Sequence, residues 1–233
     1  GCFDYSQQEP RLVVHYASLD QDSSVFNVKD AYNEGDADFH TIVAKMAQIP
    51  RDQAKTINLG LFYGMGKAKL QAELGVSKDK AEELFSVYHN RVPFVRTLMK
   101  SVSNRAQQRG QIRTLLGRLC RFHLWEPNSF GMHKALPFEQ AVQEHGPGIK
   151  RAYTYKALNK LIQGSAADMT KKSMLELYKE GIVAHIQVHD ELDISVEDDK
   201  KAKRIKEIME SAVELEIPNK VDYEKGTNWG DIK

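Results

Sequence analysis

Apolar residues recur every three to four positions along most of the chain, which is the spacing of amphipathic helices. Pro10 and Pro50 each stand just ahead of such a run, and proline suits the first turn of a helix. The pattern predicts one helix over 11–19 and another from Arg51 to about Tyr63. The same spacing predicts further helices over 78–89, 93–108, 153–180 and 200–214.

The segment 182–196 alternates instead, with apolar residues at every second position over 182–188 and again over 192–196. This period predicts two short strands. In a tight hairpin Asp190 would sit at the turn, where an aspartate is ordinary turn chemistry. Alternatively, Asp190 and Glu191 form a pair of carboxylates held on rigid strands, as a magnesium site requires. The segment alone leaves both interpretations open.

Between the helical runs, residues 124–148 are rich in proline, glycine and asparagine. These breakers predict an irregular insertion. With helices dominant and few strands, the expected fold class is mixed α/β (α+β) and mostly helical.

Composition narrows the class of protein. The chain has 233 residues, of which 41% are hydrophobic and 28% charged, enough for a folded globular protein. Two cysteines, Cys2 and Cys120, exclude a disulfide framework, and no Cys/His cluster has structural zinc spacing. No run approaches the roughly 18–20 apolar residues of a membrane span. We therefore expect a cytoplasmic protein with no membrane partner.

The formal net charge of +1 hides an uneven distribution. From Leu84 to Trp125 every charged residue is basic and none is acidic. Such a segment would suit a polyanionic partner. A solvated helical face is the alternative. The basic residues are Arg91, Arg96, Lys100, Arg105, Arg109, Arg113, Arg118 and Arg121.

The predicted helix from Arg51 carries a second candidate constellation. Arg51, Lys55, Leu59 and Tyr63 recur every four residues and therefore share one face. Such a face could bind a triphosphate at its basic end and stack a base or sugar at Tyr63. Alternatively, Leu59 and Tyr63 belong to the core while the two cations are solvated.

Four segments, taken in order, resemble the catalytic half of family-A (polymerase I-like) DNA polymerases, and Asn228-Trp229 matches the way these proteins end. The resemblance covers essentially the whole chain except 124–148. The sequence of residues 155–162 resembles phage members of the family more than bacterial ones. It implies a palm over 1–29 and 151–233, fingers over 30–150, and template-directed DNA synthesis. The four segments are Asp4-Tyr-Ser-Gln-Gln-Glu-Pro-Arg11, Arg51-Asp-Gln-Ala-Lys-Thr-Ile-Asn-Leu-Gly-Leu-Phe-Tyr-Gly64, Gln163-Gly-Ser-Ala-Ala-Asp168 and Gln187-Val-His-Asp-Glu-Leu192.

The resemblance also implies a metal centre. Asp4 and Asp190 would come together in the palm and hold two Mg²⁺ ions about 3.5–4 Å apart, with Mn²⁺ able to substitute. The backbone carbonyl of Tyr5 would be a further ligand, and Glu191 a nearby auxiliary carboxylate. Catalysis would then consist mainly of positioning and charge neutralisation.

By the same resemblance, the incoming dNTP is bound by residues of the first two segments and by His40 between them. Lys55 would donate a proton to pyrophosphate, and Glu9 would close off the 2′ side of the sugar. Glu9 thereby disfavours an RNA-synthesising relative. Leu59 stands where relatives commonly carry Phe or Tyr, which predicts altered use of dideoxynucleotides. The dNTP residues are Tyr5, Glu9, His40, Arg51, Lys55, Leu59 and Tyr63.

The resemblance further implies contacts to primer-template DNA, made largely to phosphates and to minor-groove acceptors that every correct base pair presents. A non-catalytic DNA-binding subunit is a rival, but the chain keeps both the acidic and the basic residues of the family. The DNA-binding residues are Arg11, Asn159, Gln163, Gln187 and His189.

Only three residues precede Asp4, whereas the family's aspartate ends a longer strand. Three residues are too few for an ordinary central strand, because strands average about five to six. Thumb and, commonly, exonuclease sequences should come before that strand. We therefore expect the C-terminal part of a split or truncated polymerase, whose partner is an upstream part with thumb and exonuclease.

Overall fold

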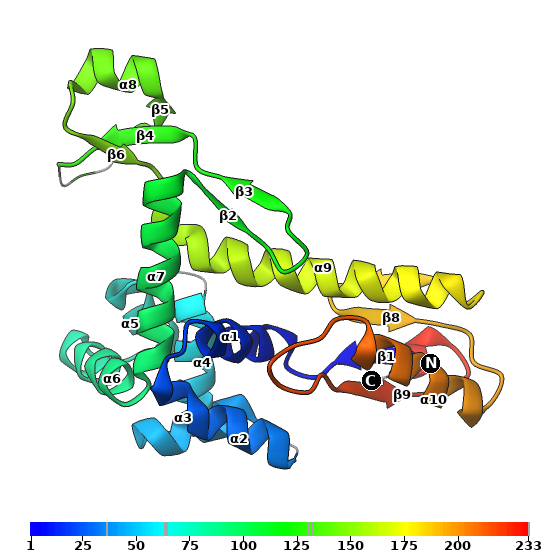
Figure 1. Ribbon diagram of the computed structural model, residues 1–233. Helices are drawn as coiled ribbons and strands as arrows, with labels where there is room; N and C mark the ends of the chain where they lie inside the picture. Colours follow the sequence, from blue (N-terminus) through cyan, green and yellow to red (C-terminus); the bar gives the residue numbers. More distant parts are fainter. Residues whose placement is uncertain (36, 63–64, 130, 132, 233) are drawn as a thin grey trace.

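The computed structural model describes residues 1–35, 37–62, 65–129, 131 and 133–232, with residue 61 described by its backbone. The predicted mixed α/β, mostly helical fold is confirmed (Figure 1). The helices are α1 (Gln8–Leu19), α2 (Phe26–Glu34), α3 (Phe39–Ala47), α4 (Arg51–Phe62), α5 (Lys67–Leu74), α6 (Lys78–Arg91), α7 (Pro93–Arg109), α8 (Phe138–His145), α9 (Ala157–Lys179) and α10 (Asp199–Ser211). The strands are β1 (Cys2–Tyr5), β2 (Gln111–Arg113), β3 (Leu119–Arg121), β4 (Leu124–Pro127), β5 (Leu136–Pro137), β6 (Ile149–Arg151), β7 (Ile186–Val188), β8 (Glu191–Asp193) and β9 (Val221–Glu224).

All the helices predicted from apolar spacing are present, with ends displaced by a few residues at most. The predicted end of α4 at Tyr63 lies outside the described residues. Helices α2, α3, α5 and α8 were not expected, because each is only eight or nine residues long and spans little more than two turns. Among the described residues, no helix combines the length and hydrophobicity needed to cross a bilayer.

A four-stranded antiparallel sheet with the order β7-β8-β1-β9 brings the two ends of the chain together. Strand β1 lies in its centre, so the expectation that too few residues precede Asp4 for a central strand is wrong. Pairing on both sides lets a four-residue strand hold this place. The two strands predicted over 182–196 are confirmed but shorter, because the chain on either side of the hairpin leaves the ladder.

The two faces of β1 differ, as the period of a strand requires. Phe3 and Tyr5 are buried in the hydrophobic core, and the Tyr5 hydroxyl is 2.6 Å from both Ser173 Oγ on α9 and the Met209 carbonyl on α10. Cys2 and Asp4 alternate with them and point to the other face. The core therefore anchors β1 from one side and leaves Asp4 available on the opposite side.

Helix α9 connects the sheet to the rest of the molecule and runs along most of its length (Figure 1). It packs against α1, α7 and α10, and it also contacts α4. Helices α2 to α7 form a second packed body around the aromatic cluster of Phe39, Phe62 and Phe94. The two bodies share one hydrophobic core.

The prediction of an irregular insertion at 124–148 is wrong. Strands β5, β4 and β6 form a small sheet that carries α8, and this unit stands at the end of α7 far from the four-stranded sheet (Figure 1). Trp125 organises it, with the Arg151 guanidinium 4.4 Å from its ring centroid and Phe138 packed at 5.0 Å. Pro127 and Pro137 end β4 and β5, so these prolines terminate strands rather than prevent them.

Candidate active site

A row of carboxylates crosses the four-stranded sheet on the face opposite the core. Asp4 on β1 stands directly across from Glu191 on β8 and from Asp222 on β9. Residues paired in this way share one face, with Cβ atoms about 4.5–5.5 Å apart. The Asp190 carbonyl accepts a hydrogen bond from the Tyr5 amide at 3.5 Å, which places Asp190 at the end of the same row.

The charges of this row disturb one another. Burial, followed by repulsion from the neighbouring carboxylates of Asp190, Glu191 and Asp222, raises the pKa of Asp4 to about 6. Burial also raises the pKa of Asp190, and a backbone hydrogen bond to its carboxylate opposes this effect. Gathered carboxylates that resist ionisation are relieved by a cation, and hard oxygen ligands suit Mg²⁺. The residues therefore fit a divalent cation.

Sequence reasoning missed Asp222. Nothing around it marks a functional residue, and only the pairing of β9 with β1 brings it beside Asp4. The register of a long-range strand pair is not visible in the local pattern.

The turn between β7 and β8 contains only His189 and Asp190, since Val188 pairs with Glu191. The interpretation of Asp190 as a turn residue is confirmed, and the pairing of Asp190 with Glu191 at a magnesium site stays a prediction. His189 adopts a left-handed backbone with φ of 54°. Such a conformation is costly for a residue with a side chain, and a two-residue hairpin turn requires it.

A cavity of about 920 Å³ lies against this turn and collects most of the predicted site residues. It is open between α1, α4, α9 and the β7–β8 turn. Its lining includes Glu9, His40, Lys55, Leu59, Gln163, Gln187, His189 and Asp190, together with Gln7, Gln8, Pro10, Ala166 and Ala167. The lining thus combines the carboxylates of Glu9 and Asp190 with a lysine and a histidine.

On α4 the structure places three residues of the predicted stripe, and its binding of a triphosphate stays a prediction. Lys55 is exposed, Leu59 is half-buried, and both line the cavity. The core face of the helix is made instead by Ala54, Ile57 and Asn58, which are fully buried. Tyr63 lies outside the described residues.

His40 is held by a buried chain of hydrogen bonds. The Asn58 amide nitrogen donates to His40 Nδ1 at 3.0 Å, and the Asn58 amide oxygen accepts from the Tyr88 hydroxyl. Burial lowers the pKa of His40. Because Nδ1 accepts, the neutral ring carries its proton on Nε2, which is then the donor available on this cavity-lining side chain.

Two glutamines of the first motif fasten the turn that follows β1. Gln7 accepts from the Phe39 amide at 2.8 Å and donates to the Ala37 carbonyl at 3.2 Å, which ties α1 to the start of α3. Gln8 donates to Thr170 Oγ1 on α9 at 3.3 Å. The bond to Thr170 gives the buried Gln8 side chain a structural role.

The prediction that Arg11 contacts DNA is not supported. Arg11 is only 4% exposed, and it donates to the Ser6 carbonyl at 2.8 Å and to the Pro218 carbonyl at 2.6 Å. Its guanidinium also lies 4.6 Å from the centroid of the Tyr32 ring. The side chain is committed to internal carbonyls, so it braces the turn after β1 rather than meeting a ligand.

Three other predicted residues lie apart from the cavity lining. Arg51 is half exposed and pairs with Asp38 at 2.7 Å, beside the cap of α3. Asn159 is one turn before Gln163 on α9 and so shares its face. The Tyr5 side chain is buried in the core, which leaves only its backbone near Asp4.

The motif on α9 docks the hairpin formed by β2 and β3. A Cβ at Gly164 would lie 2.6 Å from Thr114 Cγ2, so only glycine allows this approach. Ser165 accepts from the Leu115 amide at 3.1 Å, and Asp168 pairs with Arg118 at 3.0 Å. The basic segment is therefore not wholly a free polyanion surface, since part of its charge is used in internal ion pairs.

Comparison with known proteins agrees with this arrangement. The chain matches the family model of DNA polymerase family A over residues 2–231. A DNA-directed DNA polymerase of Pseudomonas phage M6 is 35% identical over 269 residues, covering 97% of this chain and 37% of the phage protein. DNA polymerase I of Bacillus caldotenax is 32% identical over 248 residues, covering 99% of this chain and 26% of the relative.

Among solved structures, the POL domain of Pol1 from M. smegmatis, in complex with DNA primer-template and dNTP, matches with a TM-score of 0.73 and 28% identity. The match covers 95% of this chain and 38% of that chain. The chain thus spans between 26% and 38% of the length of these similar proteins. From the family match over residues 2–231 and these relatives, the chain belongs to DNA polymerase family A.

Proposed function

We propose that the chain catalyses template-directed transfer of deoxynucleotides to a primer 3′ end. One observation carries the proposal: the carboxylate pair of Asp4 and Asp190 adjoins a cavity lined by Lys55 and His40. Nucleotidyl transfer needs anionic ligands for metal ions and cationic groups for a triphosphate side by side. The similar M. smegmatis domain, in complex with DNA primer-template and dNTP, supports the choice of substrates.

The metal centre of the proposal uses residues already in place. Asp4, Asp190 and the Tyr5 carbonyl would hold two Mg²⁺ ions, with Glu191 as an auxiliary carboxylate. Bound Mg²⁺ supplies charge neutralisation and a lowered pKa for the primer hydroxyl. The raised pKa of Asp4 supports this assignment, because a site built to hold cations accumulates negative charge.

The remaining cavity residues would bind and orient the dNTP. Nε2–H of His40 donates a hydrogen bond to a phosphate oxygen, and Lys55 neutralises the triphosphate and gives a proton to the leaving pyrophosphate. Glu9 occupies the 2′ side of the sugar and disfavours ribonucleotides. Arg51 reaches the triphosphate by exchanging its partner Asp38 for phosphate oxygens.

DNA contacts follow from the cavity rim. Gln163 and Asn159 on one face of α9, with Gln187 and His189 beside the β7–β8 turn, would contact template and primer. In this proposal residues 1–29 and 151–233 act as palm and residues 30–150 as fingers. The chain would work with the further part of a family-A polymerase, including a thumb.

Primer extension tests the proposal. A labelled primer on a template is incubated with dNTPs or NTPs and Mg²⁺, using the chain alone and the chain with the thumb-bearing part of the phage relative. We expect extension with dNTPs that disappears in Asp190→Asn and persists in Asp199→Asn, whose exposed carboxylate pairs with Lys225.

Three results would count against the proposal. Extension that survives Asp190→Asn would exclude the carboxylate centre. Preference for NTPs would indicate an RNA-synthesising relative. Intact DNA binding without extension, alone or with the thumb-bearing part, would indicate a non-catalytic subunit.

A further inference from the structure

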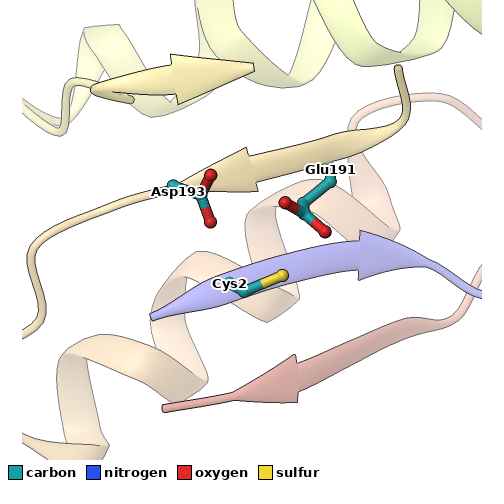
Figure 2. Close-up of side chains that lie close together, drawn as sticks. All are labelled: Cys2, Glu191 and Asp193. Carbon is teal, nitrogen blue, oxygen red and sulfur yellow. The ribbon is translucent and has the colours of Figure 1, made fainter. Parts of the chain in front are cut away.

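A thiol and two carboxylates converge between β1 and β8, beside the proposed magnesium site. Cys2 stands directly opposite Asp193, and Glu191 follows on the same face of β8. The Sγ of Cys2 and one carboxylate oxygen from each acid lie within 4.8 Å of one another. Figure 2 shows the three side chains turned toward the same space between the two strands.

Asp193 gives the second, independent observation. It is 7% exposed, and neither of its carboxylate oxygens has a hydrogen-bond partner within the described part of the chain. A buried carboxylate without a partner is unfavourable, and native structures explain such groups by an ion or water bound there. Both oxygens of Asp193 are therefore available as ligands.

The group is separate from the pair of Asp4 and Asp190. Neither of those residues belongs to the set whose ligand atoms lie so close together. Asp4 is two residues from Cys2 on the same face of β1, so the two groups adjoin. Only Glu191 takes part in both neighbourhoods.

The donor set selects the metal. Mg²⁺ takes oxygen ligands, whereas a cysteine thiolate combined with carboxylates suits Zn²⁺. A Zn²⁺ ion bonds to sulfur at about 2.3 Å and to carboxylate oxygen at about 2.0–2.2 Å. The three ligand atoms lie within 4.8 Å of one another, and ligand atoms around one ion lie closer together than this limit. Side-chain rotation must therefore bring them in.

We propose that Cys2, Glu191 and Asp193 form a Zn²⁺ site that ties β1 to β8. The ion replaces the proton of the thiol, takes one oxygen from each carboxylate, and leaves a fourth position for water. This proposal does not rest on polymerase activity. Its consequence is a cross-link between the first strand and the hairpin that carries Asp190, which stabilises the sheet when Zn²⁺ is bound.

Cobalt is the probe for the test, because tetrahedral Co²⁺ replaces Zn²⁺ and a thiolate ligand gives it a charge-transfer absorption. The metal-free chain is titrated with CoCl₂ in excess Mg²⁺, and Zn²⁺ is then added. We expect one equivalent of Co²⁺ to produce the thiolate band and Zn²⁺ to abolish it.

Matched variants locate the ligands. Cys2→Ser should remove the band, whereas Cys120→Ser, which changes the other cysteine of the chain, should retain it. Asp4→Asn should also retain it. Asp193→Asn should weaken Zn²⁺ binding more than about tenfold, since even outer partners of a metal site cost that much.

The wild-type titration decides the matter even where a variant fails to fold. No thiolate band in the wild-type chain would overturn the proposal, as would a band that survives in folded Cys2→Ser. A band lost in folded Cys120→Ser or in folded Asp4→Asn would also overturn it, because the ligand would then lie elsewhere.

Discussion

The side-chain amide of Asn58 donates to Nδ1 of His40 across 3.0 Å, and this bond sets which ring nitrogen carries the proton. Asn58→Leu removes the donor and leaves the Tyr88 hydroxyl without its partner, at a cost of about 1–3 kcal/mol. We expect the KM for dNTP to rise in Asn58→Leu as the imidazole loses its fixed tautomer.

Tyr88→Phe is the control, because it keeps the bond between Asn58 and His40. It should lower the free energy of unfolding by about 1 kcal/mol and leave the KM nearly unchanged. Steady-state kinetics and denaturant unfolding separate the two effects. Equal KM values in both variants would contradict the role assigned to Asn58.

The raised pKa of Asp4 predicts a dependence of stability on pH and metal. Because the pKa of Asp4 is about 6 in the folded chain against an ordinary value of 3.8, the carboxyl favours folding when protonated. Its contribution is present below the unfolded pKa and is lost as pH rises through the folded pKa. With a chelator present, the raised pKa of Asp4 should therefore lower the melting temperature as the pH rises from about 4 to about 7.

Asp4→Asn should flatten that fall, and Mg²⁺ should raise the melting temperature at neutral pH in the wild type but not in this variant. Thermal unfolding with and without Mg²⁺ measures both effects. If Asp4→Asn kept the wild-type pH profile and its response to Mg²⁺, neither the shifted carboxyl nor its metal role would stand.

Leu59 lines the cavity as an aliphatic side chain where relatives commonly have an aromatic one. A dideoxynucleotide lacks the 3′-hydroxyl and so cannot make that group's hydrogen bond. In Leu59→Tyr the phenol hydroxyl can make this hydrogen bond instead, which is worth about 1 kcal/mol. We expect the ratio of kcat/KM for dideoxynucleotide over deoxynucleotide to rise by roughly five- to tenfold. Leu59→Ile, which conserves volume, should leave the ratio near the wild-type value, and equal inhibition of Leu59→Tyr and wild type would refute the idea.

Gly164 and Thr114 form a contact that admits no extra methyl group. Gly164→Ala places its Cβ 2.6 Å from Thr114 Cγ2, and such overpacking costs about 1–3 kcal/mol. Adding Thr114→Ser removes that methyl and keeps the hydroxyl that donates to the Arg118 carbonyl, so it should restore most of the stability.

Gly148→Ala is the matched control, because nothing lies within 4 Å of its added Cβ. Urea unfolding of the single and double variants measures the coupling. Additive losses in the double variant would show that the clash is not the cause.

Arg11→Met tests whether this arginine acts inside the fold. Its removal leaves buried carbonyls without a donor, so the free energy of unfolding should fall by about 2–4 kcal/mol. The salt dependence of DNA binding should keep its wild-type slope, since no phosphate contact is lost. Arg113→Ala, on the exposed side of β2, is the comparison and should reduce that slope by about one. A reduced slope in folded Arg11→Met would restore its role as a DNA contact.

Local pattern predicted the helices well, because a stripe of apolar residues is visible in the sequence wherever the helix buries one face. The cavity was also largely predictable from the family motifs, since Lys55, His40 and Asp190 are all in it. The neighbours of Asp4 across the sheet could not all be predicted from the sequence. Asp222 joins the carboxylate row only through a register set by distant strands, which leaves no local trace.

Two errors have definite physical causes. The family resemblance implied that Arg11 contacts DNA, but backbone carbonyls within the fold can satisfy a guanidinium as well as phosphates can. The prolines of 124–148 were taken as a sign of irregular chain. They end short strands, whose few residues give too brief an alternation to stand out.

The central place of β1 has a consequence for how the molecule folds. Its neighbours are β8 and β9, so β1 has no partner in the sheet until nearly all of the residues that follow it have been added. The bond from the Gly1 amine to the Ile194 carbonyl spans a sequence separation of 193. Closing so large a loop is slow, whereas the local contacts of α3 to α7 form early. Asp4 should therefore reach Asp190 late in folding, after the helical body around α4 is already assembled.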